Sequence, residues 1–321
     1  MKPLIVPDIG INHGGSIRVA KRMIKAIKLC GGTCVKMQLH MPEQEMSREC
    51  KTIKPGNSTH SIWDIINSSN LSLRQHRDLR TYAKHLGLMY ICTPFCLEAV
   101  DELVKMDVDV IKIGSGEVNN VPLLRKVAKT KIPVILSSGM NTINSVAEAF
   151  EIVKPICILH CNSVYPTPFN KVRLGRMEAM KGCFPVSIGY SDHCVGIGPS
   201  IIALGMGAQV IEKHFTMIGG SGPDVEVSMG GLEFRELLVL AKVVDKVMSG
   251  PSADDSITKQ FAFHSIVAKT DIKKGETLKP SNITVKRPGT GIPAREYDSV
   301  LGQRAKANIK IDTVIKSKDI Q

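Results

Sequence analysis

Two histidines end two apolar runs of the sequence, His193 in "GYSDHCVGIG" and His214 in "VIEKHF". Their spacing alone is weak evidence for a metal site, because no His-Glu-x-x-His pattern accompanies them. If the two runs are neighbouring strands of a barrel, however, the imidazoles lie close together. Two imidazoles with water form an open site for a divalent Lewis acid. His193 and His214 are therefore candidate metal ligands, with two unrelated polar residues as the alternative.

Two lysines, Lys36 in "VKMQ" and Lys112 in "VIKIG", are embedded in strand-like runs. An unpaired ammonium there costs several kcal/mol, so each lysine needs a partner or an anionic ligand. Serines follow comparable runs at Ser115, Ser137 and Ser191. Together they favour a cradle for phosphate or carboxylate, with paired structural lysines and helix-capping serines as the alternative. Glu117, in "SGE", is a candidate acid or base at the same edge, and a salt bridge to a lysine is its alternative interpretation.

The elements that must position these residues follow from periodicity. Eight short apolar runs occupy the first two thirds of the chain: LIVPDIGIN, TCVKMQ, LMYICTPF, VIKIGSGE, PVILSSGM, ICILHCNSVYP, VSIGYSDH and AQVIEKHF. Such near-continuous apolar strands are typical of parallel sheets covered on both faces. Between most of them lie segments of helical spacing, one behind a Ser16 cap and one behind a capping box of Ser72 and Gln75. Strand then helix, eight times, predicts a (β/α)8 TIM barrel in the α/β class, with a doubly wound open sheet as the alternative.

Polar residues gather at the C-terminal ends of these runs, which favours the barrel. In a barrel all eight ends lie on one face, so the side chains converge on one site. The residues concerned are Asn12, His13, Lys36, Gln38, Thr93, Lys112, Ser115, Glu117, Ser137, Ser163, Tyr165, Ser191, His193, Glu212 and His214.

Two interruptions of the rhythm carry information about organisation. Residues 41–70 separate the second strand from the next helix, and so long a βα connection is usually a lid or a substrate-binding element. The polar stretch "MSGPSADDSITKQ" is typical of a domain boundary. We therefore expect a barrel over residues 1–248, a linker over 249–262, and a small, mostly β domain over 263–321, where short β-like runs alternate with turns.

Composition excludes several classes of protein. The formal net charge is +12, but the basic residues are scattered among acids and only 4% of residues are aromatic, so we expect no nucleic-acid partner. No run approaches the roughly 18 apolar residues of a membrane span, and no signal-peptide pattern is present, so a cytoplasmic protein without a membrane partner is expected. The nine cysteines are an odd count, and several lie in apolar runs, so we expect reduced thiols.

Ordered motifs along nearly the whole chain resemble the N-acetylneuraminate (sialic acid) synthase family. They are "GINHGGS", "VKMQLH", "CTPF", "KIGSGE", "ILSSGM", "HCNSVYPTP", "GYSDH", "EKHF" and "GPD". The tail "VAKTDIKKGETL…VKRPGTGI" is similar to that family's C-terminal antifreeze-like (SAF) domain. So many motifs in one order make the resemblance specific.

The resemblance implies an enzyme, a transferase that condenses phosphoenolpyruvate with an open-chain N-acyl hexosamine. The typical sugar is N-acetylmannosamine, and the products are N-acetylneuraminate and phosphate. It also implies a domain-swapped homodimer, and a Mn²⁺ or Mg²⁺ ion between His193 and His214 that polarises the sugar aldehyde. C3 of phosphoenolpyruvate then attacks the aldehyde, water adds at C2, and phosphate leaves.

The resemblance also assigns residues. Those expected to hold phosphoenolpyruvate are Lys36, Lys112, Ser115, Ser137, Ser191, Thr93 and Phe95. Those expected to meet the sugar are Gln38, Asn57, Tyr165, Asp224 and, reaching across from the dimer partner, Arg287 of the second domain with Phe261 beside it. Catalytic roles fall to Glu117, Asp8, Lys36 and Lys112. Two features depart from the family pattern: Asp8 stands where glutamate is usual, and the loop "MIGGSGPD" after His214 is shorter and lacks a basic residue.

Alternatives remain open inside and outside this class. A legionaminic or pseudaminic acid synthase shares the fold and takes a diacylated deoxyhexosamine, but "IKPGNSTHSIWDI" favours the sialic acid branch. An inactive barrel acting as a carbohydrate-binding scaffold is the alternative of another class. The retained Lys36, Lys112, Glu117 and histidine pair argue against it.

Overall fold

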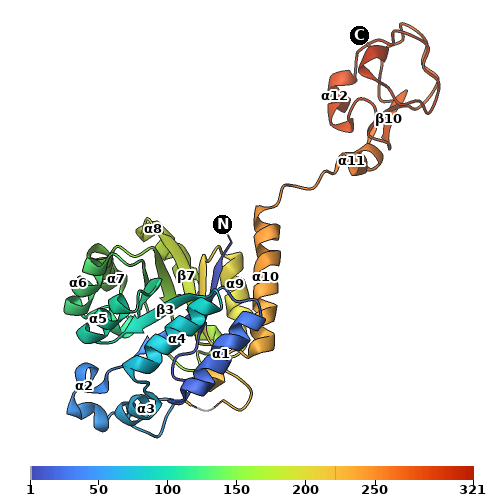
Figure 1. Ribbon diagram of the computed structural model, residues 1–321. Coiled ribbons are helices and arrows are strands. Elements are labelled where there is room, and N and C mark those ends of the chain that lie inside the picture. The colour runs from blue at the N-terminus through green and yellow to red at the C-terminus, as the bar shows by residue number, and fades with distance from the viewer. Residues whose placement is uncertain (1, 221) are drawn as a thin grey trace. The chain divides into compact units, whose positions relative to one another are not determined.

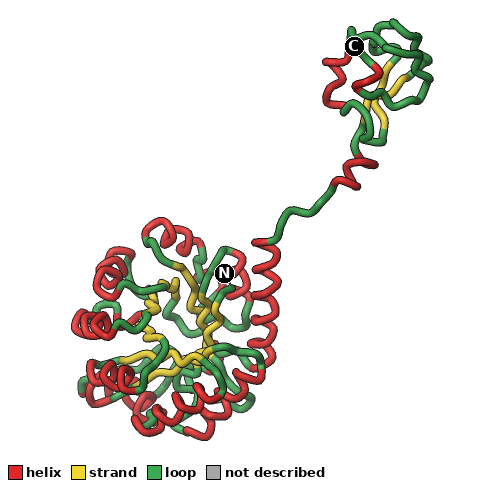
Figure 2. Tube along the Cα trace, turned by 45° about the horizontal axis from the view of Figure 1, so that its top comes forward, coloured by secondary structure: helices red, strands yellow, loops and turns green. Residues whose placement is uncertain are grey.

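A computed structural model describes residues 2–220 and 222–321. The chain divides into two compact units, Met1–Gly250 and Pro251–Gln321. The first is a closed barrel of eight parallel strands in the order β1 to β8, and Figure 2 shows its strands enclosed by helices. The strands are β1 Leu4–Asp8, β2 Cys34–Leu39, β3 Met89–Pro94, β4 Val110–Ile113, β5 Val134–Ser137, β6 Cys157–Cys161, β7 Ser187–Asp192 and β8 Val210–His214. The predicted barrel is confirmed, and the open sheet is excluded because β1 pairs with both β2 and β8.

Helices follow the strands and cover the outside of the barrel (Figure 1). They are α1 Ile17–Leu29, α4 Leu73–His85, α5 Leu97–Lys105, α6 Val121–Thr130, α7 Ile143–Val153, α8 Gly175–Cys183, α9 Gly198–Gly205 and α10 Gly231–Ser249. Two predicted starts are confirmed: Ser16 accepts a hydrogen bond from the Val19 N–H, and Ser72 and Gln75 form a reciprocal capping box. None of the helices described here is long and apolar enough to cross a membrane.

Residues 41–70, treated as one long loop in the sequence analysis, contain local structure. They form α2 Pro42–Glu45, the 3-10 turn η1 Arg48–Lys51 and α3 Ile62–Ser69. Helix α3 begins at Ser61, whose side chain accepts from the Asp64 N–H and caps the apolar run that follows. Other 3-10 turns are η2 Ser115–Glu117, η3 Phe169–Lys171 and η4 Val225–Val227.

The inward face of the barrel changes character from one end to the other. Toward the N-terminal ends of the strands it is a buried apolar layer of Val6, Cys34, Ile91, Val110, Ile135, Cys157, Leu159 and Val210. Gly189 belongs to this layer, and a β-carbon there would lie 2.3 Å from the Val210 carbonyl oxygen, so only glycine fits. Because side chains alternate along a strand, the next inward residues lie two or four positions further on, and these reach the C-terminal mouth. The apolar layer thus closes the barrel beneath those residues.

The second unit has its own core. Strands β9 Ser265–Ala268 and β10 Ile283–Lys286 pair antiparallel, and isolated bridges extend the β structure. Its helical pieces are α11 Ser256–Ala262, within the predicted linker, with η5 Ala294–Glu296, α12 Tyr297–Val300 and η6 Ser317–Asp319. Eleven buried apolar residues, among them Ile266, Leu278 and Ile315, make a separate cluster.

Candidate active site

The C-terminal mouth of the barrel holds a cavity of about 880 Å³ to which all eight strands contribute. It collects every site residue that the sequence analysis predicted within the barrel. They are Asp8, Lys36, Gln38, Asn57, Thr93, Phe95, Lys112, Ser115, Glu117, Ser137, Tyr165, Ser191, His193, His214 and Asp224. Arg287 and Phe261 lie in the second unit, where both side chains are exposed.

Two residues predicted to converge on this site do not line the cavity. The Asn12 amide donates to the Phe215 carbonyl oxygen at 3.0 Å and to Ser228 Oγ at 2.8 Å. His13 Nδ1 accepts from the Gly15 N–H at 3.1 Å, and burial lowers the pKa of His13 to about 4. Both residues follow β1 rather than belonging to it, so the strand alternation does not govern where they point. The prediction was wrong for these two.

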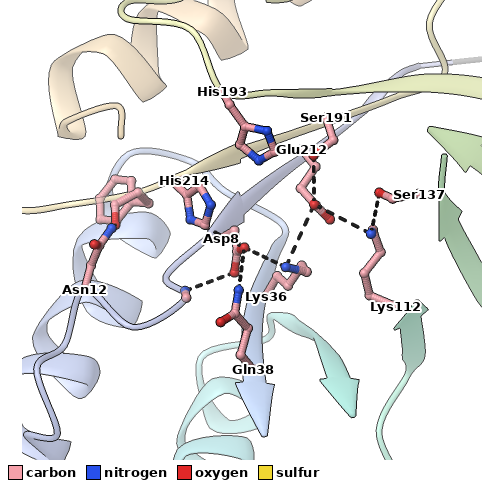
Figure 3. Close-up of polar contacts among 12 residues, drawn as sticks. Asp8, Asn12, Lys36, Gln38, Lys112, Ser137, Ser191, His193, Glu212 and His214 are labelled. Atoms are coloured by element: carbon pink, nitrogen blue, oxygen red, sulfur yellow. Dashed lines mark hydrogen bonds and ion pairs between the residues drawn. The ribbon is translucent and has the colours of Figure 1, made fainter. Parts of the chain in front are cut away.

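A buried cluster of four charges forms the floor of the cavity (Figure 3). Lys36 Nζ lies 2.6 Å from Asp8 Oδ2 and 3.9 Å from Glu212 Oε1. Lys112 Nζ lies 3.8 Å from the same Glu212 oxygen and donates to Ser137 Oγ at 2.6 Å. Both ammonium groups are therefore paired, which offsets the cost of burying them.

The two lysines differ in their charge environment. Burial favours the neutral form of both, but Lys36 faces two carboxylates, and their attraction leaves its pKa raised above 10.5. Burial also disfavours the charged form of Lys112. Attraction by Glu212 only partly offsets this effect, and repulsion by Lys36 adds to it, so the pKa of Lys112 is lowered from 10.5. Burial opposes ionisation of Asp8 as well, yet the nearby Lys36 and His214 lower its pKa overall. Although shorter than glutamate, Asp8 reaches both residues.

Glu212 is the residue whose role the sequence analysis missed. It was placed among the converging polar residues but given no function, yet it bridges both lysines and accepts a hydrogen bond from Ser191 Oγ at 3.1 Å. Its position two residues before His214 on β8 was the available signal, because alternate residues of a strand share a face.

Glu117 occupies a different environment at the rim. It accepts a hydrogen bond from the Asn120 amide at 2.7 Å, and burial raises its pKa. No lysine or arginine pairs with it among residues 2–220 and 222–321. A carboxyl group with a raised pKa is a candidate general acid or base.

The two candidate metal ligands face each other with ring centroids 5.5 Å apart. His193 Nδ1 lies 2.7 Å from the Asn162 carbonyl oxygen, which can only accept, so this nitrogen carries the hydrogen. Its Nε2 lies 2.9 Å from the Tyr165 hydroxyl. His214 Nδ1 is buried without a hydrogen-bond partner, 3.5 Å from Asp8 Oδ2. Gly10, at φ +52°, leaves room for this ring, since a β-carbon there would lie 3.2 Å from its Cε1 and Nδ1 atoms.

The lid, defined here as residues 41–70, and the loop after β8 close over the cavity from one side. The Asn57 amide donates to the Pro223 carbonyl oxygen at 3.2 Å, and Asp224 follows in the same loop; Ser221 lies outside the described residues. Ile11, Met46, Ile62, Ile65 and Ile66 pack together and also line the cavity. This group, called the isoleucine wall below, makes one side of the cavity apolar.

A model described as the NeuB family matches residues 23–252, and a model described as the SAF domain matches residues 263–321. The N,N'-diacetyllegionaminic acid synthase of Campylobacter jejuni is 36% identical over 331 residues, covering 98% of this chain and 99% of that protein.

The chain is also similar to a human protein and to a bacterial protein of known structure. The N-acetylneuraminate-9-phosphate synthase of Homo sapiens is 32% identical over 326 residues, covering 97% of this chain and 90% of that protein. The crystal structure of an N-acetylneuraminic acid synthetase from Leptospira borgpetersenii, in complex with citrate, superposes with a TM-score of 0.73 at 25% identity. That match covers 80% of this chain and 90% of the other.

Proposed function

This chain belongs to the NeuB family of sialic acid synthases, and from that premise we propose that it condenses phosphoenolpyruvate with an N-acylated hexosamine. The products are a nine-carbon 2-keto acid and phosphate. The observation that carries the proposal is the buried layer of lysines and serines at the barrel mouth, directly beside two facing histidines. An inactive scaffold has no need to bury Lys36 and Lys112 in this way, because each costs desolvation energy.

Phosphoenolpyruvate is proposed to bind above the charged floor. Lys112 donates to Ser137 Oγ at 2.6 Å, so both are positioned for a phosphate or carboxylate oxygen that replaces this internal contact. Ser115 and Ser191 add hydroxyl donors, and Thr93 and Phe95 line the same region. The Thr93 hydroxyl is buried without a hydrogen-bond partner, which supports a role toward a ligand.

The two histidines fit a divalent metal ion, Mn²⁺ or Mg²⁺. The hydrogen on His193 Nδ1 leaves Nε2 as the lone-pair nitrogen on the cavity side, and the Nδ1 atom of His214 lacks a partner. No third His, Cys, Asp or Glu joins the pair in the described part of the chain, which leaves coordination positions for water and substrate oxygens. Bound there, the ion would act as a Lewis acid on the sugar aldehyde.

The remaining chemistry falls to side chains of this chain. A bond forms between C3 of phosphoenolpyruvate and C1 of the sugar, and the aldehyde oxygen takes up a proton to become a hydroxyl. Water adds at C2 and loses a proton, and the C2–O bond to phosphate then breaks, which leaves the 2-keto group and free phosphate. Glu117 is proposed to take the proton of the attacking water, since its buried carboxyl has a raised pKa. Asp8 holds Lys36 in place at 2.6 Å, and its Oδ2 atom lies 3.5 Å from His214 Nδ1.

The sugar is proposed to lie between the histidines and the lid, against Gln38, Asn57, Tyr165 and Asp224. Arg287 and Phe261 of a second copy would complete this region in a domain-swapped homodimer. The motif "IKPGNSTHSIWDI" favours N-acetylmannosamine, but the match to the Campylobacter jejuni legionaminic acid synthase favours the alternative branch. The isoleucine wall supports the same choice, because a deoxy sugar with two acyl groups presents more apolar surface than N-acetylmannosamine.

One assay tests these proposals together. Purified protein is incubated with phosphoenolpyruvate, Mn²⁺ and either a 2,4-diacetamido-2,4,6-trideoxyhexose or N-acetylmannosamine, and phosphate and keto acid are measured. We expect release with both sugars and a higher kcat/KM for the diacetylated one. A higher value for N-acetylmannosamine would return the substrate to the sialic acid branch. No release with any sugar would contradict the enzyme itself and favour the scaffold.

A further inference from the structure

His40 directly follows β2 and connects the cavity floor to the lid. Its side chain is 8% exposed, and its ring stacks on Phe95 with centroids 4.2 Å apart and planes inclined by 12°. Nδ1 lies 2.9 Å from Glu45 Oε1 on α2, and Nε2 lies 3.2 Å from Gln38 Oε1. The ring therefore touches a lid residue and two cavity residues at once.

The orientation of the Gln38 amide follows from its other neighbour. Gln38 Nε2 lies 3.5 Å from Asp8 Oδ2, and an ionised carboxylate only accepts hydrogen bonds. The amide NH2 group must face Asp8, whose pKa is low, so the amide oxygen faces His40. His40 Nε2 must then be a donor.

The other ring nitrogen of His40, Nδ1, also faces a hydrogen-bond acceptor. Glu45 Oε1 faces His40 Nδ1, and Glu45 Oε2 accepts a hydrogen bond from the Met41 N–H at 3.1 Å. Both Glu45 oxygens thus act as acceptors, which suits an ionised carboxylate. An imidazole satisfies two acceptors only when both of its nitrogens carry hydrogen.

We propose that His40 is a positioning residue, held as an imidazolium by Glu45, that fixes Gln38 with one amide N–H on Asp8 and the other directed to a sugar oxygen. The inference rests on the proposed function, because Gln38 is assigned to the sugar there. It makes α2 part of the sugar site, since the anchor of the ring lies on that helix. Binding of the sugar and the position of the lid are then coupled through one side chain.

The other titratable groups around His40 are compatible with a single cation at this place. Glu117 and, beyond Gln38, Asp8 contribute carboxylates. The neighbouring histidines His13 and His76 are neutral at physiological pH, because burial lowers their pKa to about 4 and about 3. No second positive imidazole therefore opposes His40 from the β1 loop or from α4.

The protonation state is tested by NMR on protein labelled with ¹⁵N-histidine, with the His40→Phe variant used for assignment. In the labelled wild-type protein we expect both ring nitrogens of His40 to be protonated at neutral pH. In Glu45→Gln the side-chain amide can donate to Nδ1, so we expect a neutral ring that keeps hydrogen only on Nε2. A neutral ring in the unchanged protein would overturn the proposal.

The positioning role is tested by steady-state kinetics of His40→Phe, which keeps the stack on Phe95 but removes both donors. Because one hydrogen bond to the sugar is lost, we expect the KM for the sugar to rise about tenfold while the KM for phosphoenolpyruvate changes less than twofold. His85→Phe, at the exposed end of α4, is the matched control and should change neither constant.

Two outcomes separate the ideas. An unchanged sugar KM in folded His40→Phe, checked by circular dichroism, would reject the positioning role even if the ring is an imidazolium. Absence of phosphate release by the unchanged protein with every sugar would reject the proposed function instead. The NMR result can be read in either case, because it needs no turnover.

Discussion

Lys112 is the group whose ionisation should limit activity at high pH. Burial lowers its pKa from 10.5, so the free protein loses this charge at a lower pH than an ordinary lysine would. An anion that needs the ammonium binds equally well below that pKa and progressively worse above it. We therefore expect kcat/KM for phosphoenolpyruvate to be flat near neutrality and to fall on an alkaline limb whose apparent pKa lies below 10.5.

The variant Lys112→Arg checks that assignment, since a guanidinium stays charged across this range. The alkaline limb should disappear, whatever the drop in rate. A limb that persists unchanged in Lys112→Arg would assign the titration to another group.

His214→Ala should remove metal binding without unfolding the barrel. The ring lies at the mouth, and its Nδ1 makes no hydrogen bond that the fold would lose. Loss of a direct ligand should weaken Mn²⁺ by more than the roughly 10- to 100-fold cost of losing an outer partner. Calorimetric titration of Mn²⁺ measures this, with His85→Ala as the control, and equal affinity in both variants would reject the metal role.

For single residues, the sequence predicted which side chains belong to the site but not which side chains they contact. The position of Lys36 and Lys112 toward the C-terminal ends of their apolar runs predicted that both converge on one site, and both line the cavity. It could not reveal that Glu212 bridges them, because that contact joins strands far apart in the chain. The role of His40 could not be predicted for a related reason: its partner Glu45 lies in a one-turn helix that carries almost no periodic signal.

Among the elements, β7 and β8 are held in register by a second charged pair, on the opposite face from the cavity. Asp192 and Lys213 are register partners, with Lys213 Nζ 3.5 Å from Asp192 Oδ2 and both side chains fully buried. Cys194 is held at both ends, since its N–H donates to Asp192 and its carbonyl oxygen accepts from Lys213 at 2.7 Å. The pair thus fixes the backbone on either side of the two candidate metal ligands.

Lys213→Met should destabilise the protein by about 3 kcal/mol, because it leaves the Asp192 charge buried and unpaired. Adding Asp192→Asn should recover at least half of that loss, and urea denaturation measures both. Lys126→Met, which breaks the exposed Lys126–Asp101 pair, is the matched control and should cost less than about 1 kcal/mol. A cost for Lys213→Met no larger than the control's would show that the pair does not hold the strands.

The elements themselves were the most predictable part of the fold. Each strand is an apolar run long enough to cross the barrel, and Ser16 and Ser72 mark helix starts with caps that depend only on local sequence. The lid was harder, because α2 and α3 are short and their stability depends on packing against neighbours such as Ile11. Local signals thus suffice where hydrogen bonds are local and fail where tertiary contacts decide.

For the whole molecule, the location of Arg287 leads to a test of shared sites. It lies in the unit Pro251–Gln321, whereas the cavity lies in Met1–Gly250. If the proposed homodimer is domain-swapped, a chain carrying Arg287→Ala and a chain carrying Lys112→Ala have complementary defects. When equal amounts are mixed and allowed to exchange, about half of the dimers are mixed and one of the two sites in each is intact, so about a quarter of normal activity should return.

Each variant alone is the control for this experiment, and size-exclusion chromatography must show dimers before and after mixing. Activity of the mixture that never exceeds the mean of the two separate variants would favour a site built within one chain.

The apolar layer under the charged floor also bears on the order in which the products leave. Val6, Ile91 and Ile135 close the barrel beneath Lys36 and Lys112, so a product formed deep in the cavity must leave through the mouth after a product formed above it. If phosphoenolpyruvate binds against the lysines as proposed, phosphate forms there and would be the last product to leave, so added phosphate should inhibit competitively with phosphoenolpyruvate and not with the sugar in steady-state kinetics. A barrel that is closed at one end thus imposes ordered product release.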